Sequence, residues 1–387
     1  LVYVGNASEK TFDKDTNQWL YKGYFADLIA EGEYYIKTEF GFYSKVFNIS
    51  NSYNELINSA LEAIYVQRCG CDTEGILGHP ACHTAPSMIF SYTKEDYVDT
   101  TGGWHDAGDY GKYGIVENKV IADLLFSYLY GDNKNEKLVD EIKYGLDYVL
   151  KLQTDYGAVY NKVVSKRFAG FISPEKDNQK TYLLTPWTSV TASFAGITGL
   201  AYEVFKDSDG ELAERCLNAH NKAIEYLINN PNASNEMNPD EFDVGTYYVN
   251  DETDERLFAY SVAYKLTKDE RYKDLCIELL NSGVDKGDFV ANCRTYAYAV
   301  LLDSLEYNSK FYNEIMTELE AECNELCKGV SDSMFNYPYE NYYWGSNQHV
   351  CEAINKLLLA SRYFKDERYV VKASEMIDYI LGLNVLD

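Results

Sequence analysis

Two carboxylates lie three residues apart in the segment GGWHDAGDYGKY, residues 102–113. These are Asp106 and Asp109, and glycines, aromatic residues and a histidine surround them. Two neighbouring carboxylates can hold and deprotonate a water molecule, one as the general base and the other as its orienting partner. Because like charges this close are coupled, their titration would belong to the pair. The segment is therefore the first candidate for a catalytic centre.

A simpler interpretation of these aspartates is helix N-capping, in which a carboxylate accepts hydrogen bonds from backbone N–H groups. The glycines weaken that interpretation, because they disfavour a simple helix start and let the backbone approach a ligand closely. Trp104 and Tyr110 add aromatic faces beside the acids. We therefore expect Trp104 and Tyr110 to be candidates for contact with a substrate such as a sugar ring.

A second cluster contains cysteine and histidine, in QRCGCDTEGILGHPACHT at residues 67–84. His105 follows His83 by 22 residues, next to the acids. A set of two cysteines and two histidines is typical of tetrahedral zinc, and four protein ligands would make that zinc structural. A disulfide with scattered histidines is the alternative. A zinc site here would join the cysteine loop to the acid loop through His105.

Two further segments carry candidate ligands. In YVNDETDER, residues 248–256, clustered acids at short spacing suit Ca²⁺, although they could equally complement the dipole of a helix that starts there. In YYWGSNQHV, residues 342–350, Tyr343 and Trp344 could stack on a sugar or anchor a helix in the core.

Most of the chain must form the helices that position these segments. Apolar residues recur at helical spacing from about residue 51 onward. The pentapeptide KDERY occurs at Lys268–Tyr272 and again at Lys365–Tyr369, each time between two helices. Such polar joints are typical of αα-hairpins, and a series of them predicts an α-solenoid or a closed helical toroid. The expected helices are 53–65, 118–130, 136–153, 188–205, 211–229, 253–266, 268–282, 291–304, 309–326, 347–363 and 367–382.

Residues 1–50 differ from the rest of the chain. Residues 34–40 and 42–49 read as strands with a turn near Gly41, which predicts a small β module or part of one. The acid loop and the cysteine loop together, about 69–117, are expected to be irregular. The chain of 387 residues therefore divides into a short β part and a large helical part.

Charge and composition exclude several classes of partner. The formal net charge is −26, which argues against nucleic acid and against anionic membranes. No apolar run is long enough for a transmembrane helix, and the first residues, LVYVGNASEK, do not follow the pattern of a signal peptide. A neutral partner fits this charge best.

The motifs together resemble glycoside hydrolase family 9, the inverting cellulases with an (α/α)6 barrel. The resemblance spans residues 51–387 and implies a mainly α six-hairpin toroid. Residues 1–50 resemble part of the immunoglobulin-like module that precedes many such barrels. The segments that carry the resemblance to glycoside hydrolase family 9 are GGWHDAGDYGKY at 102–113, QRCG at 67–70, HPACH at 79–83, YYWGSN at 342–347 and EMIDYILGLN at 375–384.

The resemblance also implies roles for individual residues. It makes Asp109 the general base, Asp106 its helper in holding the water, and Trp344 a wall of the sugar-binding cleft. The implied zinc ligands are Cys69, Cys82, His83 and His105, and the implied calcium ligands are Asp251, Asp254 and Glu255.

One expected feature of the family does not occur in residues 1–387. The family's general acid is a glutamate in an Asn-Glu motif beyond the LGLN segment, after a histidine-rich sugar-binding motif, and neither is found here. The resemblance therefore implies a barrel that lacks its last segment, with the acid supplied by sequence beyond residue 387.

The expected activity is endo-acting hydrolysis of β-1,4-glucan by a secreted, extracellular enzyme, with further modules possible outside these residues. The alternatives are exo-action on oligosaccharides and glycan binding without catalysis.

Overall fold

The computed structural model describes residues 1–14, 16–25, 27–50, 53–132, 134–249, 251–282 and 292–384. The chain divides into two compact units, one formed by residues 1–60 with 317–387 and the other by residues 61–316. Among the described residues, none of the helices is both long enough and apolar enough to cross a membrane.

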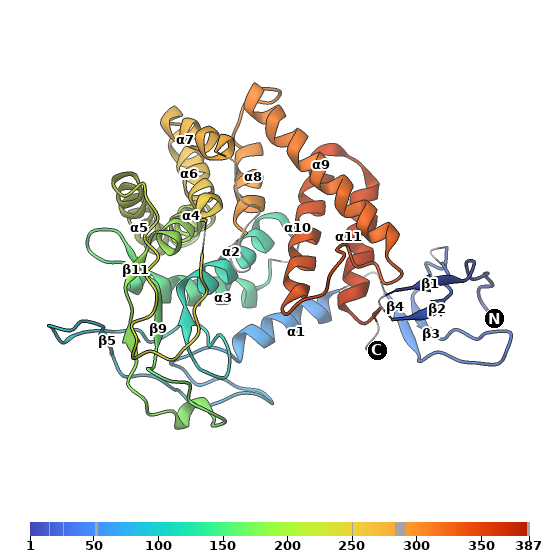
Figure 1. Ribbon diagram of the computed structural model, residues 1–387, viewed down its shortest axis with the longest axis horizontal. Helices are drawn as coiled ribbons and strands as arrows, with labels where there is room; N and C mark the ends of the chain where they lie inside the picture. Colours follow the sequence, from blue (N-terminus) through green and yellow to red (C-terminus); the bar gives the residue numbers. More distant parts are fainter. Residues whose placement is uncertain are drawn as a thin grey trace. The chain divides into compact units, whose positions relative to one another are not determined.

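Residues 61–316 hold helices of two kinds. α2, α4, α6 and α8 are buried over most of their surface, whereas α3, α5 and α7 bury one face and expose the other. Figure 1 shows α4 beside α5 and α6, which are its main packing partners. The bounds are α2 Gly114–Tyr130, α3 Glu136–Val149, α4 Thr188–Phe205, α5 Gly210–Asn229, α6 Thr253–Thr267, α7 Glu270–Asn281 and α8 Arg294–Leu302.

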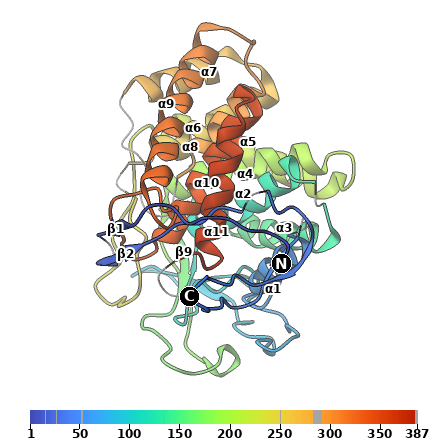
Figure 2. The same cartoon turned by 90° about the vertical axis from the view of Figure 1, so that its right-hand side faces the viewer.

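The other helices are α1 Asn54–Tyr65, α9 Lys310–Asp332, α10 Ser346–Phe364 and α11 Glu367–Ile380. The helices α10 and α11 lie side by side as a hairpin, which Figures 1 and 2 both show in red. The eleven helices predicted from apolar spacing are all present in the described residues.

The two KDERY joints adopt the same local structure. In each, the lysine has a left-handed backbone, with φ of 55° at Lys268 and 54° at Lys365. The following aspartate accepts a hydrogen bond from the backbone N–H of the arginine two residues later, at 3.0 Å for Asp269 and 2.9 Å for Asp366. That arginine's guanidinium also pairs with the aspartate, and such an N-terminal cap starts the next helix.

A five-stranded sheet was not foreseen, and three of its strands lie in the region 69–117 that was expected to be irregular, while the other two lie within residues 162–183. Its order is β6-β5-β10-β9-β7, with β5 and β10 parallel and the other pairs antiparallel. A separate antiparallel pair joins β8, Val159–Tyr160, to β11, Pro186–Trp187. Short 3₁₀ turns lie at Leu150–Leu152 and Pro174–Lys176. The strands of the larger sheet are β5 Ser87–Ile89, β6 Asp96–Val98, β7 Lys112–Tyr113, β9 Lys162–Val164 and β10 Tyr182–Leu183.

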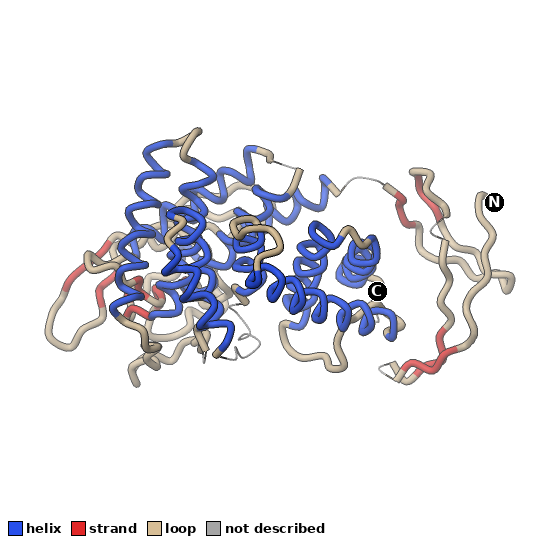
Figure 3. Tube along the Cα trace, turned by 90° about the horizontal axis from the view of Figure 1, so that it is seen from above, coloured by secondary structure: helices blue, strands red, loops and turns tan. Residues whose placement is uncertain are grey.

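Residues 1–50 form two small hairpins, drawn as short red segments among loops in Figure 3. β1, Thr11–Asp13, pairs with β2, Gln18–Leu20, and β3, Gly32–Tyr34, pairs with β4, Phe47–Ile49. A tight turn at Thr38–Phe42 includes Gly41, as predicted, but the strands cover only Gly32–Tyr34 and Phe47–Ile49 and not the predicted ranges 34–40 and 42–49. The predicted boundary between an immunoglobulin-like module and the barrel falls at residues 51–52, outside the described residues.

Candidate active site and metal centre

The two candidate catalytic aspartates lie on one tight loop. The N–H of Asp106 donates to the carbonyl of Gly111 at 3.0 Å, and the N–H of Tyr110 donates to the carbonyl of Ala107 at 3.1 Å. Both aspartates are half-buried. The loop leads directly into β7, which fixes its far end to the sheet. The structure thus brings Asp106 and Asp109 together on one turn, and N-capping of a helix is not their role.

A tyrosine hydroxyl holds each of these carboxylates. Tyr113 donates to Oδ2 of Asp109 at 2.8 Å, and Tyr247 donates to Oδ2 of Asp106 at 2.6 Å. The two tyrosine rings meet edge to face, with centroids 4.9 Å apart and an interplanar angle of 88°. Tyr247 was missed from the sequence because it lies 141 residues from Asp106. The network leaves each carboxylate one oxygen that these tyrosines do not contact.

Burial and charge tune this pair. The pKa of Asp106 is raised, first by burial and then by the charge of Asp109, while the hydrogen bond from Tyr247 opposes the rise. Burial also raises the pKa of both tyrosine hydroxyls, so they remain protonated donors at neutral pH. A carboxylate pair with fixed donors on one side can direct its other oxygens toward a water molecule.

Trp104 is a core residue, and the prediction that it stacks on a sugar is wrong. Its side chain is only 6% exposed. The indole N–H donates to Oε2 of Glu141 at 3.1 Å, and the backbone N–H donates to Oε1 of Glu117 at 3.0 Å. A buried indole finds such a partner because an unpaired N–H would be costly. Trp104 therefore anchors the acid loop in the core through Glu117 and Glu141.

Glu117 on α2 is a buried acid that sequence reasoning did not single out. Burial raises its pKa to about 8. Its Oε1 also lies where a side chain at Gly103 would be, because a Cβ at that residue would stand 2.9 Å from Oε1 and 2.6 Å from the ring of Tyr148. Gly103, with φ of +73°, lets the acid loop pass this close to α2.

We expect Glu117→Gln to flatten the pH dependence of stability. The ordinary pKa of a glutamate is 4.5 and that of folded Glu117 is about 8, so the folded state binds the extra proton between these values. The free energy of unfolding should then fall as pH rises across this window, by up to about 1.4 kcal/mol per pH unit. Gln keeps an acceptor for Trp104 but cannot ionise. Urea unfolding of both proteins from pH 5 to pH 8 measures the difference, and equal slopes would contradict the assignment.

The four predicted zinc ligands do come together. One donor atom each from Cys69, Cys82, His83 and His105 lies within 4.8 Å of the others, and three of these residues are buried. Two short segments are paired to build this group, since the N–H of Cys69 donates to Gly103 and the N–H of His105 donates to Gln67, both at 2.8 Å. The group is the only such cluster among the residues that the structure describes. No disulfide forms between its cysteines.

The chemistry of this cluster fits a divalent cation. The pKa of Cys69 is lowered, chiefly by a hydrogen bond with the Cys82 thiol, and the pKa of Cys82 is raised by the same neighbour. Two such thiols share one proton unless a cation joins them.

His83 uses one ring nitrogen to contact a carboxylate and leaves the other without a hydrogen bond to any described residue. Its Nε2 lies 3.3 Å from Oδ2 of Asp177, and its buried Nδ1 has no hydrogen-bond partner in the described structure. Metal-binding histidines usually present one nitrogen to the metal and the other to a carboxylate. Burial lowers the pKa of His83, but Cys69 and Asp177 outweigh it and the pKa is raised. Asp177, 94 residues away in sequence, was missed because nothing in its local sequence marks it.

The remaining predicted substrate contacts have different surroundings. Tyr110 packs its ring against His83 and His105, at centroid distances of 5.7 and 5.0 Å, and its hydroxyl donates to the carbonyl of Ile172. Tyr343 and Trp344 precede α10 and are 47% and 81% exposed. They belong to the unit that does not contain the aspartates, so their contact with substrate stays a prediction.

The predicted calcium ligands are only partly assembled. Asp254 and Glu255 are buried on the first turn of α6, and both oxygens of Glu255 lack a hydrogen-bond partner in the described structure. Burial raises the pKa of both acids. Buried carboxyl oxygens without donors suit a bound cation.

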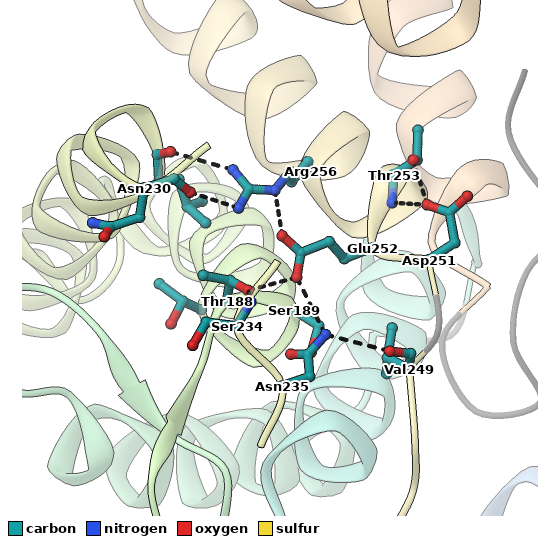
Figure 4. A network of polar contacts seen from close by, with 12 residues as sticks. Thr188, Ser189, Asn230, Ser234, Asn235, Val249, Asp251, Glu252, Thr253 and Arg256 are labelled. Atoms are coloured by element: carbon teal, nitrogen blue, oxygen red, sulfur yellow. Dashed lines mark hydrogen bonds and ion pairs between the residues drawn. The ribbon is translucent and has the colours of Figure 1, made fainter. Parts of the chain in front are cut away.

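Asp251 does not join them in a three-carboxylate group within the described residues. It binds the backbone and hydroxyl of Thr253 instead, as Figure 4 shows. The neighbouring Glu252 is also engaged, by Arg256 and Thr188 at 2.6 Å each. The part of Asp251 in a calcium site therefore stays a prediction, and its side chain accepts hydrogen bonds from Thr253, the first residue of α6.

Comparison with known proteins gives concordant matches. The model of Glycosyl hydrolase family 9 matches residues 53–387. The chain is 29% identical over 423 residues to a cellodextrinase of Butyrivibrio fibrisolvens, covering 100% of this chain and 77% of that protein. It is 29% identical over 416 residues to Endoglucanase D of Acetivibrio thermocellus, covering 99% of this chain and 66% of that protein.

Solved structures match over nearly the whole chain. The GH family 9 endoglucanase J30 has 25% identity and a TM-score of 0.90, covering 99% of this chain and 77% of that one. A structure described as the Zn-binding triple mutant of the same enzyme has 26% identity and a TM-score of 0.89, with the same two coverages. The predicted mainly α six-hairpin fold class is thereby confirmed.

Proposed function

Because the chain belongs to glycosyl hydrolase family 9, we propose that it hydrolyses β-1,4-glucosidic bonds in cellulose or a related β-glucan as an inverting endoglucanase. The observation that carries the proposal is the pair of half-buried carboxylates, Asp106 and Asp109, each held by one tyrosine hydroxyl. The relatives named as a cellodextrinase and an endoglucanase support the same substrate class.

In this proposal Asp109 is the general base and Asp106 helps to hold the attacking water. Inverting glycosidases place their two catalytic carboxyl groups about 6.5–9.5 Å apart on opposite faces of the sugar, which leaves room for that water. Two acids on one tight turn cannot flank a sugar ring, so both serve the water side. Protonation of the leaving oxygen then requires a third carboxyl group on the opposite face.

The test is hydrolysis of carboxymethyl cellulose by the full-length protein, with ¹H NMR of the anomer released first. Inversion at a β-linkage produces the α-anomer, so early release of the β-anomer would exclude the inverting mechanism. Mixed-linkage glucan and xyloglucan in parallel assays would define the range of substrates. Binding of cellohexaose without any product would instead favour a non-catalytic glycan-binding protein.

Exo-action on oligosaccharides is the second candidate, and the similarity to a protein named cellodextrinase favours it. The two modes differ in how viscosity and product release are related. An endo-acting enzyme lowers the viscosity of carboxymethyl cellulose early, whereas an exo-acting enzyme releases short sugars while viscosity stays high. Sizing of early products from cellohexaose decides between them.

We further propose that Cys69, Cys82, His83 and His105 hold one structural Zn²⁺. Support comes from the two-thiol, two-imidazole donor set and from the unpartnered Nδ1 of His83. Four protein ligands leave no position open for water, so the metal would supply stability rather than chemistry. It would fix His105, and with it the adjacent Asp106, to the cysteine loop.

Ca²⁺ is proposed at Asp254 and Glu255. We expect removal of calcium by a chelator to lower Tm, and Glu255→Gln to abolish the stabilisation that added Ca²⁺ provides, because the cation neutralises two buried carboxylates. Thermal unfolding with EGTA and with excess Ca²⁺ measures both effects. Glu203→Gln, a change to a partly exposed acid on α4, is the matched control. A Glu255→Gln protein that still gains stability from Ca²⁺ would contradict the site.

The setting of the enzyme is also a proposal. Polymeric β-glucan cannot enter cells, so we propose a secreted, extracellular protein. The net charge of −26 suits a neutral glycan partner and neither nucleic acid nor an anionic membrane. The hairpins of residues 1–50 are proposed to be part of an immunoglobulin-like module, with further modules possible outside these residues.

A further inference from the structure

Lys162 is a charged residue buried beside the candidate active site, with only 1% of its surface exposed. It lies on β9, directly opposite Tyr113 on β7 in the antiparallel register. Burial of an ammonium group is costly unless the group is paired and hydrogen-bonded. A methionine would fill similar space without that cost, so the charge itself requires an explanation.

The ammonium group connects two parts of the structure. Nζ of Lys162 donates to the carbonyl of Gly245 at 2.9 Å and to Oγ1 of Thr246 at 3.3 Å. The same atom lies 5.4 Å from the centroid of the Tyr113 ring. Gly245 itself packs closely on this ring, because a Cβ at that residue would stand 2.9 Å from the Tyr113 hydroxyl oxygen. Lys162 therefore fastens the segment of residues 245–246 against Tyr113.

This segment delivers Tyr247 to the acid pair. Residues 245–249 form neither helix nor strand, so side-chain anchors must set their position. Tyr247 follows Thr246 directly and donates to Asp106, while Tyr113 donates to Asp109. Lys162 thus holds in place the two tyrosines whose hydrogen bonds orient the carboxylates.

The charge environment agrees with this geometry. Burial lowers the pKa of Lys162 to about 8, and the carboxylate of Asp109 acts in the opposite direction. The amine is therefore mostly protonated at neutral pH and can donate to both acceptors.

We propose that Lys162 is a positioning residue for hydrolysis, whose ammonium group holds Gly245–Tyr247 against Tyr113 so that the two tyrosine hydroxyls fix Asp106 and Asp109. The inference rests on the proposed function, since it assigns a reaction to these carboxylates. Lys162 contacts neither of the two carboxylates directly in this scheme, and it acts through Tyr247 and Tyr113.

The test compares Lys162→Met with Lys166→Met in the full-length protein. Lys166 is the control, because its Nζ also lies over an aromatic ring, 5.4 Å from the centroid of Tyr182, but its side chain is 42% exposed and pairs with Glu241 outside the acid network. We expect Lys162→Met to lower kcat on β-glucan by about 100-fold, the cost of a small displacement of catalytic groups, with KM within about twofold. The control should retain wild-type kcat. Thr246→Val, which removes one acceptor, should give a smaller loss and serves if Lys162→Met does not fold.

A double-mutant cycle shows whether the effect passes through Tyr247. Tyr247→Phe should lower kcat as well, and the double variant should be no worse than the poorer single variant, because both changes break the same path. Losses that multiply would overturn the proposal. So would wild-type kcat in both Lys162→Met and Thr246→Val.

A structural measurement separates this inference from the proposed function. A crystal structure of Lys162→Met, or of Thr246→Val, should show the Tyr247 hydroxyl displaced from Asp106. This result decides the positioning role even if the wild-type protein cleaves none of the tested glycans, an outcome that would refute only the proposed function. An unchanged hydrogen bond from Tyr247 to Asp106 would overturn the inference.

Discussion

Asp109→Asn is expected to lower kcat for β-1,4-glucan hydrolysis by about 10²–10⁴-fold, the usual contribution of a general base. The amide has nearly the same shape and keeps an oxygen that can accept the hydrogen bond from Tyr113. It cannot accept a proton from water, so the loss should appear in kcat, while KM and Tm stay close to wild type. Reducing-sugar release from carboxymethyl cellulose measures kcat, and calorimetry measures Tm.

Two further variants make this result specific. Asp96→Asn changes an exposed aspartate on β6 and should leave activity unchanged. Asp106→Asn should also reduce kcat, because Asp106 holds the same water, but by less than Asp109→Asn. Equal activity in Asp109→Asn and wild type would remove Asp109 from the role of base. A larger loss in Asp106→Asn would exchange the two roles.

Loss of the metal centre is expected to have the largest effect on stability. The purified protein should contain about one zinc per chain, and Cys82→Ser should contain much less. We expect this variant to lose more than about 4 kcal/mol of unfolding free energy, since removal of a buried metal site belongs to the most damaging classes of change. Elemental analysis and urea unfolding check the two parts of the prediction separately.

Two variants in the same region provide the controls. Cys71→Ser changes a cysteine two residues from Cys69 that lies outside the four-donor group, so it should keep its zinc and its stability. Asp177→Asn weakens the orientation of His83 and should reduce zinc affinity by about 10–100-fold. A wild-type protein purified without chelators and free of metal would refute the zinc site. Equal zinc loss in Cys71→Ser and Cys82→Ser would refute the choice of ligands.

Local patterns in the sequence predicted the helices well. The range 188–205 was predicted from apolar spacing and is identical to that of α4, and α11 ends two residues before its predicted end. Helical periodicity is a local property, so it can be recognised without knowledge of distant contacts. The cysteine and histidine cluster was visible in the sequence, but the choice of Cys69, Cys82, His83 and His105 within it came from the resemblance to the family, since Cys71 and His79 lie in the same segment.

Long-range partners could not be predicted in the same way. The sheet strands β7 and β10 have only two residues each and are too short to give an alternating pattern. The tyrosine that holds Asp106 lies in an irregular segment of a chain with 37 tyrosines, so nothing local marks Tyr247. For Trp104 the local sequence was misleading. An aromatic residue beside catalytic acids suggests ligand contact, and only the position of Glu141 on α3 reveals that its indole is buried.

The two KDERY joints also bear on how such a chain could be rebuilt. The same five residues give the same left-handed lysine and the same aspartate-arginine clasp before α7 and before α11. Since the helices on either side differ in sequence, the five residues of the joint must determine its shape. These five residues could therefore serve as a short connector between helices in an unrelated scaffold.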